Sequence, residues 1–172
     1  MEEEKIVRAV KEEVMDEAFE KVLKYLKWMG REIVDVSKED RVVILLEKIK
    51  GYDDKVKVLI KIFNENWLGM MAILLTKEDM KKLGIEEYKL LQQLLKLSFN
   101  AAEFNFALDP EGNILIKEDI HLAALSFDVF EEEYFAIPSA IKAFRDKILP
   151  ILTEYKEISE NKFKEIVDTL YT

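Results

Sequence analysis

The chain has 172 residues, 49% of them hydrophobic, and this size and composition predict a single folded domain with a sizeable core. It contains no cysteine, which excludes disulfides and cysteine-ligated zinc or iron–sulfur sites. Its formal net charge of −9 opposes phosphate backbones and anionic lipid surfaces, so we expect neither a nucleic-acid partner nor a membrane partner.

The start of the chain is acidic and lacks the apolar stretch of a signal peptide, and no apolar run is long enough to span a bilayer. Both features favour a cytoplasmic protein. Lysine and glutamate dominate the charged residues, and only four arginines occur. This balance is typical of thermophile surfaces.

Residues 2–29 read as one long amphipathic helix, which Gly30 is placed to end. Its apolar residues recur at steps of three and four and form one stripe, made by Ile6, Val7, Val10, Val14, Ala18, Val22, Leu26 and Met29. Such a stripe predicts a helix that faces the core, and a partner-binding helix is the alternative.

Three strands are expected next, at 41–48, 55–63 and 67–75. The second alternates between apolar residues and lysines, which is the period of a half-buried strand. The third is apolar on both faces. Because short turns join the three, they should pair antiparallel.

Helices are then expected after Thr76 and over 86–98, with Gly84 between them. A hairpin follows, in which strands 102–108 and 113–117 flank the turn at 109–112.

The rest of the chain reads as helical, beginning with Asp128 as an N-cap. Pro138 should kink or break this helix near Ile137, and residues 139–155 should continue it. A last amphipathic helix is expected at 160–171, with a stripe made by Phe163, Ile166, Val167 and Leu170.

This order predicts an α+β fold, in which helices pack on a five-stranded antiparallel sheet in the order α-β-β-β-α-β-β-α-α. Residues 1–157 should form a single α+β domain. The C-terminal amphipathic helix in 158–172 should pack on that domain or be appended to it.

One segment also resembles a known family. Residues 106–116 read Phe-Ala-Leu-Asp-Pro-Glu-Gly-Asn-Ile-Leu-Ile, and an apolar loop at 121–126 precedes the helix. Together with the order of elements, this segment is similar to the type III secretion chaperone-like fold and to the YbjN-like family that shares it. The resemblance implies a small, acidic, often dimeric protein that binds other polypeptides, and it supplies no catalytic residue. It does not imply secretion machinery.

Candidate chemistry is sparse. His121 follows Glu118 and Asp119, so an imidazole–carboxylate general base is conceivable, although a structural or solvated histidine is the simpler interpretation. Acidic runs at 2–4, 12–16 and 131–133 read as solvated helix faces rather than cation sites. No glycine-rich phosphate loop or nucleophile elbow occurs. We therefore predict no catalytic, cofactor-binding or metal-binding residue and no cofactor.

The informative feature is excess apolarity in strands 42–46 and 67–75, which offer apolar groups to both faces of the sheet. Helices can cover one face, and the other must meet more of this chain, a second copy or a ligand. The residues predicted to bind a partner are Trp67, Met70, Met71 and Ile73. The sequence does not determine which alternate residues of this strand face outward.

We therefore expect a non-catalytic protein-binding or chaperone-like regulatory module that forms a homodimer and binds a polypeptide partner. Two alternatives remain open. One is an enzyme of unrecognised type that uses carboxylates and His121. The other is a structural subunit of a larger complex, docking through the 160–171 helix.

Overall fold

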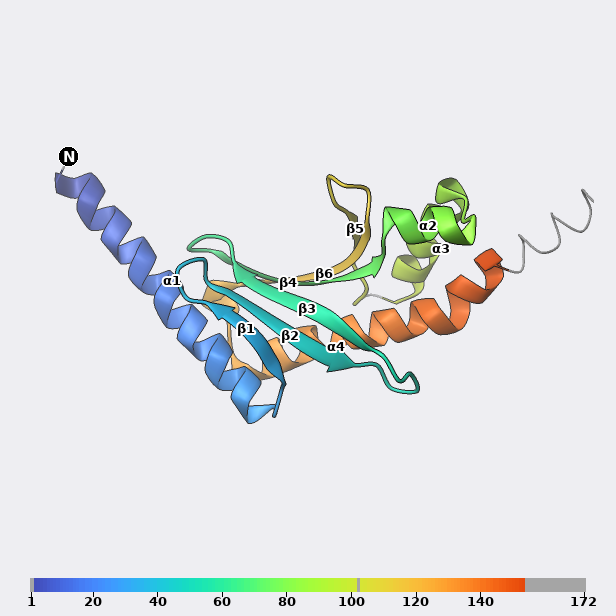
Figure 1. Cartoon of the computed structure of the whole chain (residues 1–172). Coiled ribbons are helices and arrows are strands. Elements are labelled where there is room, and N and C mark those ends of the chain that lie inside the picture. Colours follow the sequence, from blue (N-terminus) through green and yellow to red (C-terminus); the bar gives the residue numbers. More distant parts are fainter. Residues whose placement is uncertain (1, 102, 154–172) are drawn as a thin grey trace, which may run out of the picture.

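The computed structural model of the chain describes residues 2–101 and 103–153 (Figure 1). Its strands form one antiparallel sheet in the order β1-β2-β3-β4-β6-β5, and helices pack against it, which confirms the α+β class. The elements are α1 (Glu2–Trp28), β1 (Ile33–Ser37), β2 (Val42–Lys48), β3 (Lys55–Ile62), β4 (Trp67–Leu75), α2 (Lys77–Leu83), α3 (Glu87–Asn100), β5 (Phe106–Leu108), β6 (Ile114–His121) and α4 (Phe127–Ala143). The helix predicted at 160–171, and with it the boundary after residue 157, lies outside the described residues.

The sheet has six strands rather than the five predicted. The additional strand is β1, which pairs with β2 through Asp35↔Ile44 and Ser37↔Val42 and has an irregular register between Ile33 and Asp35. Four of its five residues are exposed. Because neither face of β1 is buried, its sequence shows no alternation of apolar and polar residues. Backbone pairing with β2 defines the strand instead.

The predicted hairpin is confirmed with shifted ends. Its first strand begins only at Phe106 instead of 102, and its second continues to His121. Within the turn, Gly112 adopts a left-handed φ of 86°, and Asp109 Oδ1 accepts a hydrogen bond of 2.7 Å from the backbone N–H of Asn113. Glycine adopts that φ without the steric cost that a side chain would add.

Two details of the last helix differ from the prediction. Ser126, not Asp128, is the N-cap, because its side chain accepts a hydrogen bond from Val129 N. The helix also runs through Pro138, so the predicted break near Ile137 does not occur, and a short π-helical segment at Phe144–Ile148 follows the helix. Neighbouring backbone bonds and the packing of this helix in the core outweigh the single bond that proline removes.

Helices α1 and α4 lie on the same face of the sheet, beneath the strands in Figure 1. The main core joins them to the inward-facing side chains of the sheet, including Leu26, Leu45, Met70, Phe130 and Tyr134. A second cluster joins α2 and α3 to the helical segment that follows α4, through residues such as Leu90, Leu94 and Phe144.

The apolar stripe of α1 faces the core over only half of its length. Ala18, Val22 and Leu26 are buried, whereas Ile6 and Val10 are more than half exposed. Figure 1 shows why: the first half of α1 extends past the edge of the sheet. The prediction of a core-facing helix is thus right for the second half and wrong for the first. In the described part of the chain, no helix is long and apolar enough to cross a membrane.

Candidate binding surface on the open face of the sheet

The sheet face opposite α1 and α4 carries a band of apolar side chains across its central strands. We call this surface the open face. Cross-strand pairs place these side chains side by side: Ile44 lies opposite Leu59, and Leu59 lies opposite Met71. Facing residues on neighbouring strands contact each other directly. The apolar members of the open face include Val42, Ile44, Leu46, Leu59, Trp67, Met71, Ile73 and Leu115.

Two of these side chains, both on the interior strand β4, are exposed to an unusual degree for apolar residues. Trp67 is 43% exposed and Ile73 is 51% exposed. No helix of the described residues lies over β2, β3 and β4 on this side (Figure 1). A contiguous apolar surface left uncovered in this way is typical of an interaction site.

The four residues predicted to bind a partner divide between the two faces of β4. Trp67, Met71 and Ile73 lie on the open face. Met70 is fully buried in the main core, because successive residues of a strand point to opposite faces. Met70 therefore contributes to stability, and a partner on the open face would contact the other three.

Phe63 adds an aromatic ring to the open face. A Cβ atom on Gly69 would lie 2.4 Å from Cε2 of Phe63, so the ring occupies the space that glycine leaves free. The side-chain amines of Lys61 and Lys117 each lie 5.9 Å from the ring centroid, within cation–π range. Beside the ring is a hollow of about 490 Å³, the aromatic pocket, lined by Phe63, Asn64, Trp67, Lys117 and Asp119.

His121 lies at the end of β6, where its contacts indicate a structural role for the side chain. Its ring meets Trp67 edge to face at 5.0 Å, and its Nδ1 accepts a hydrogen bond of 3.2 Å from Ala123 N. It lines neither the aromatic pocket nor the acidic pocket described next. The enzyme hypothesis requires carboxylates and His121 to line one pocket together. Neither of these two pockets shows that arrangement.

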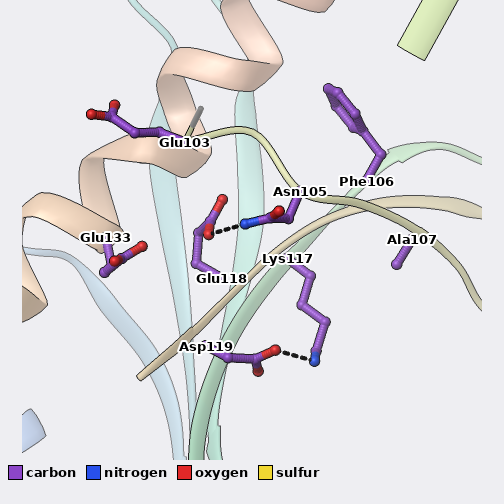
Figure 2. A pocket seen from close by; sticks show the side chains of 8 residues that line it. All are labelled: Glu103, Asn105, Phe106, Ala107, Lys117, Glu118, Asp119 and Glu133. Carbon is purple, nitrogen blue, oxygen red and sulfur yellow. Dashed lines mark hydrogen bonds and ion pairs between the residues drawn. The ribbon is translucent and has the colours of Figure 1, made fainter. Parts of the chain in front are cut away.

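A second hollow, of about 450 Å³, lies at the border of the sheet where β5 begins (Figure 2). We call it the acidic pocket, and it is lined by Glu103, Asn105, Phe106, Ala107, Lys117, Glu118, Asp119 and Glu133. The pairing of β5 with β6 stops at Phe106↔Ile116, and one further hydrogen bond runs from Lys117 N to Asn105 O at 2.9 Å. Beyond it, β6 pairs only with β4 among the described strands.

Glu118 is the unusual member of the acidic pocket because it is only 3% exposed. Its Oε2 accepts a hydrogen bond of 2.8 Å from Asn105 Nδ2, whereas no donor in the described part of the chain reaches its buried Oε1. Burial raises the pKa of Glu118 to about 7; the hydrogen bonds from Asn105 oppose this shift, and the charges of Glu133 and Asp119 add to it.

Glu133 projects from α4 toward Glu118, as Figure 2 shows. Burial and the charges of Glu132 and Glu103 raise its pKa. A hydrogen bond with Glu118 opposes that shift, and such a bond requires a proton on one of the two carboxyl groups. The pocket therefore favours a bound proton or another positive charge at neutral pH.

The acidic pocket was missed by sequence reasoning, although one signal was present. Glu118 lies two residues from Ile116 and from Ile120, on the same face of the strand. The alternation of faces along a strand therefore predicts that Glu118 is buried. No comparable signal marks Glu133 within its acidic run. Among the other predicted acidic faces, Glu12 and Asp16 pair with Arg41 at 2.5 and 2.8 Å. No cluster of three potential metal ligands occurs in the described residues.

No protein-family model and no curated protein matches the sequence. Solved structures of similar fold include a chain of the HopA1–SchA chaperone–effector complex, with a TM-score of 0.53, 15% identity, and coverage of 74% of this chain and 94% of that one. A chain of the ExsC–ExsE complex gives a TM-score of 0.52, 16% identity, and coverage of 73% and 88%.

The Yersinia pestis type III secretion chaperone SycH, in complex with a stable fragment of YscM2, gives a TM-score of 0.50, 13% identity, and coverage of 75% and 98%. An uncharacterised protein from Methanothermobacter thermautotrophicus gives a TM-score of 0.50, 16% identity, and coverage of 80% and 98%. The chain therefore has the type III secretion chaperone-like fold that its sequence predicted. Its relation to the YbjN-like family stays a prediction.

Proposed function

We propose that the protein is a non-catalytic module that binds a segment of another polypeptide on the open face of its sheet. The observation that carries this proposal is the exposure of Trp67, Phe63 and Ile73 on a sheet face that no described helix covers. Burying such side chains against a partner removes apolar surface from water and stabilises the complex.

The structures of similar fold support the same class of function. SchA is described in a chaperone–effector complex, ExsC in a complex with ExsE, and SycH with a fragment of YscM2. A non-catalytic role and the cytoplasmic location inferred from the sequence fit this class, and we retain both as part of the proposal.

The test is peptide selection against the purified protein, using a displayed library of random linear peptides. We expect enriched peptides that bind the wild type and lose affinity for Ile73→Lys, which places a charge in the apolar band. The matched control is Ile151→Lys, since Ile151 is 41% exposed on the last helix. Selected peptides that bind Ile73→Lys as well as the wild type would place binding elsewhere and contradict the proposal.

We also propose that the protein self-associates through a second apolar surface, formed by α3 and β5. Tyr88, Leu95 and Phe99 share one side of α3 and are 66%, 70% and 90% exposed, and Leu108 on β5 is 53% exposed. Sedimentation velocity should show a dimer for the wild type and a monomer for the pair of changes Leu95→Glu and Phe99→Glu. A monomeric wild type over the accessible concentration range would overturn this part.

A further inference from the structure

The acidic pocket holds a buried carboxyl group with no cation of the described residues beside it to pair with its ionised form. Glu118 is 3% exposed, and its Oε1 has no hydrogen-bond donor among the described residues. An ionised carboxylate in such a position is costly unless a cation or a further donor pairs with it. In the described part of the isolated chain, the pocket thus lacks a positively charged group or a further hydrogen-bond donor for Glu118.

The other charged residues around Glu118 do not supply the missing positive charge. Four of the eight lining residues are acidic, and Lys117 is the one basic residue among them. The amine of Lys117 lies 2.5 Å from Oδ2 of Asp119 and is therefore already paired. Glu133 and Glu103 add negative charge, from α4 and from the segment before β5.

The shape and lining of the pocket indicate which cation would fit. Phe106 contributes an apolar side chain to the lining, while Glu118 and Glu133 supply acidic groups. Lysine and arginine side chains have this same division, with an apolar stem and a charged end. A metal ion is a poorer match, because no cluster of three potential ligands occurs in the described part of the chain.

The pocket is continuous with the open face. Lys117 and Asp119 line both the acidic pocket and the aromatic pocket, so the two hollows meet across the border of β6. At that border β6 has no strand partner beyond the single bond to Asn105 among the described residues. A polypeptide that lies against Trp67 and crosses the border would bring a side chain to Glu118.

We propose that the acidic pocket binds the ammonium or guanidinium group of a lysine or arginine in the polypeptide that the open face receives. This inference rests on the proposed function and adds the chemistry of one position in the partner. The net charge of −9 favours a basic partner segment over a second copy of this chain.

The test uses peptides enriched on the open face, each resynthesised with the basic residue nearest the pocket replaced. Lysine is replaced by norleucine and arginine by citrulline, which keep the stem and remove the charge. We expect the uncharged versions to bind wild type about ten to a hundredfold more weakly, since hydrogen bonds to charged groups contribute about 1.5–3 kcal/mol.

The variant Glu118→Gln keeps the shape of the pocket and should remove this preference for a charged side chain. Glu78→Gln is the matched control, because it removes one negative charge from an exposed site on α2. It should keep the preference. A preference that persists in Glu118→Gln, or that Glu78→Gln abolishes equally, would overturn the inference.

A second measurement does not depend on any peptide. Side-chain carboxyl carbons can be followed by NMR while propylguanidinium is added to the full chain. We expect the Glu118 signal to shift and its pKa to fall, with no such response at Glu78. A silent Glu118 signal would overturn the inference even if peptides bind the open face.

The two proposals can therefore fail separately. Peptides that lose affinity for Ile73→Lys but show no charge preference leave the proposed function standing and remove the pocket inference. A change in sedimentation of Glu118→Gln, without a change in peptide binding, would show that a second copy supplies the cation and would equally overturn it.

Discussion

The hydroxyl of Tyr134 on α4 donates a hydrogen bond of 2.5 Å to Oε2 of Glu47 on β2, inside the core. The other oxygen of Glu47 accepts a bond of 3.0 Å from Nη1 of Arg31, so the buried carboxylate is paired from two sides. Burial and the bond to Glu47 raise the pKa of Tyr134 above its ordinary value. This network attaches α4 to the face of the sheet that lies opposite the open face.

Removing the Tyr134 hydroxyl should therefore destabilise the fold. We expect Tyr134→Phe to lower the free energy of unfolding by about 1–3 kcal/mol, because Glu47 would keep its burial and lose a donor. Urea denaturation measures this loss. Tyr52→Phe is the control: its hydroxyl donates to Asp146 at 2.7 Å on the surface, and we expect a smaller loss. Equal losses would contradict the role of burial.

The two adjacent methionines of β4 should respond differently to truncation. Met70 is fully buried, so Met70→Ala should cost about 2–5 kcal/mol of unfolding free energy. Met71 lies on the open face and is half-buried, so Met71→Ala should cost less than about 1.5 kcal/mol. Thermal or urea unfolding of both variants makes the comparison. The reverse order would mean that β4 presents its other face to the helices.

Gly69 should tolerate no side chain while Phe63 keeps its position. A Cβ atom there would lie 2.4 Å from the Phe63 ring and 2.9 Å from Oδ1 of Asp119, so Gly69→Ala must displace the ring. We expect a loss of about 1–3 kcal/mol in unfolding free energy and a change in Trp67 fluorescence. The double variant Phe63→Ala, Gly69→Ala should lose less than the sum of the single variants. Additive losses would show that the ring does not occupy this space.

The stability of the protein should depend on pH through Glu118. Its pKa of about 7 in the folded chain lies above the ordinary glutamate value of 4.5, so the folded state binds more protons between these values. The free energy of unfolding therefore falls as pH rises through this window, and the loss is complete above the folded pKa.

Glu118→Gln lacks this titration, so its stability relative to wild type should increase from pH 4.5 to 7. We expect a relative gain of about 1–3 kcal/mol, reduced by the solvent that reaches the pocket. Urea unfolding at several pH values measures it. Because Glu133 is hydrogen-bonded to Glu118, the difference between the two proteins reports the titration of this coupled pair. A difference that does not vary with pH would contradict the raised pKa.

Much of the fold could be predicted from sequence because its main strands carry strong patterns. Alternation of valine and isoleucine with lysine located β3, and the turn that contains Gly112 located the hairpin. Strand β1 has no such pattern, since both of its faces are exposed. Its position depends on backbone pairing with β2 and not on a pattern of its own side chains.

The candidate site was predictable only in part, for a related reason. Strand β4 is apolar on both sides, so no alternation distinguishes the face of Met70 from that of Met71. The acidic pocket combines Glu118 on β6 with Glu133 on α4, and only the tertiary structure brings the two together. The alternation of faces along β6 could have indicated that Glu118 is buried, but not which residues pack against it.

The short strand β1 has a consequence for assembly. It occupies the border of β2 with five residues, an irregular register and an outward aspartate, Asp35. Such a border resists the addition of another strand, whereas the border at β6 is partly free. Growth of the sheet from one molecule to the next can proceed at one side only. Association should therefore end in a closed, finite particle instead of an extending fibre.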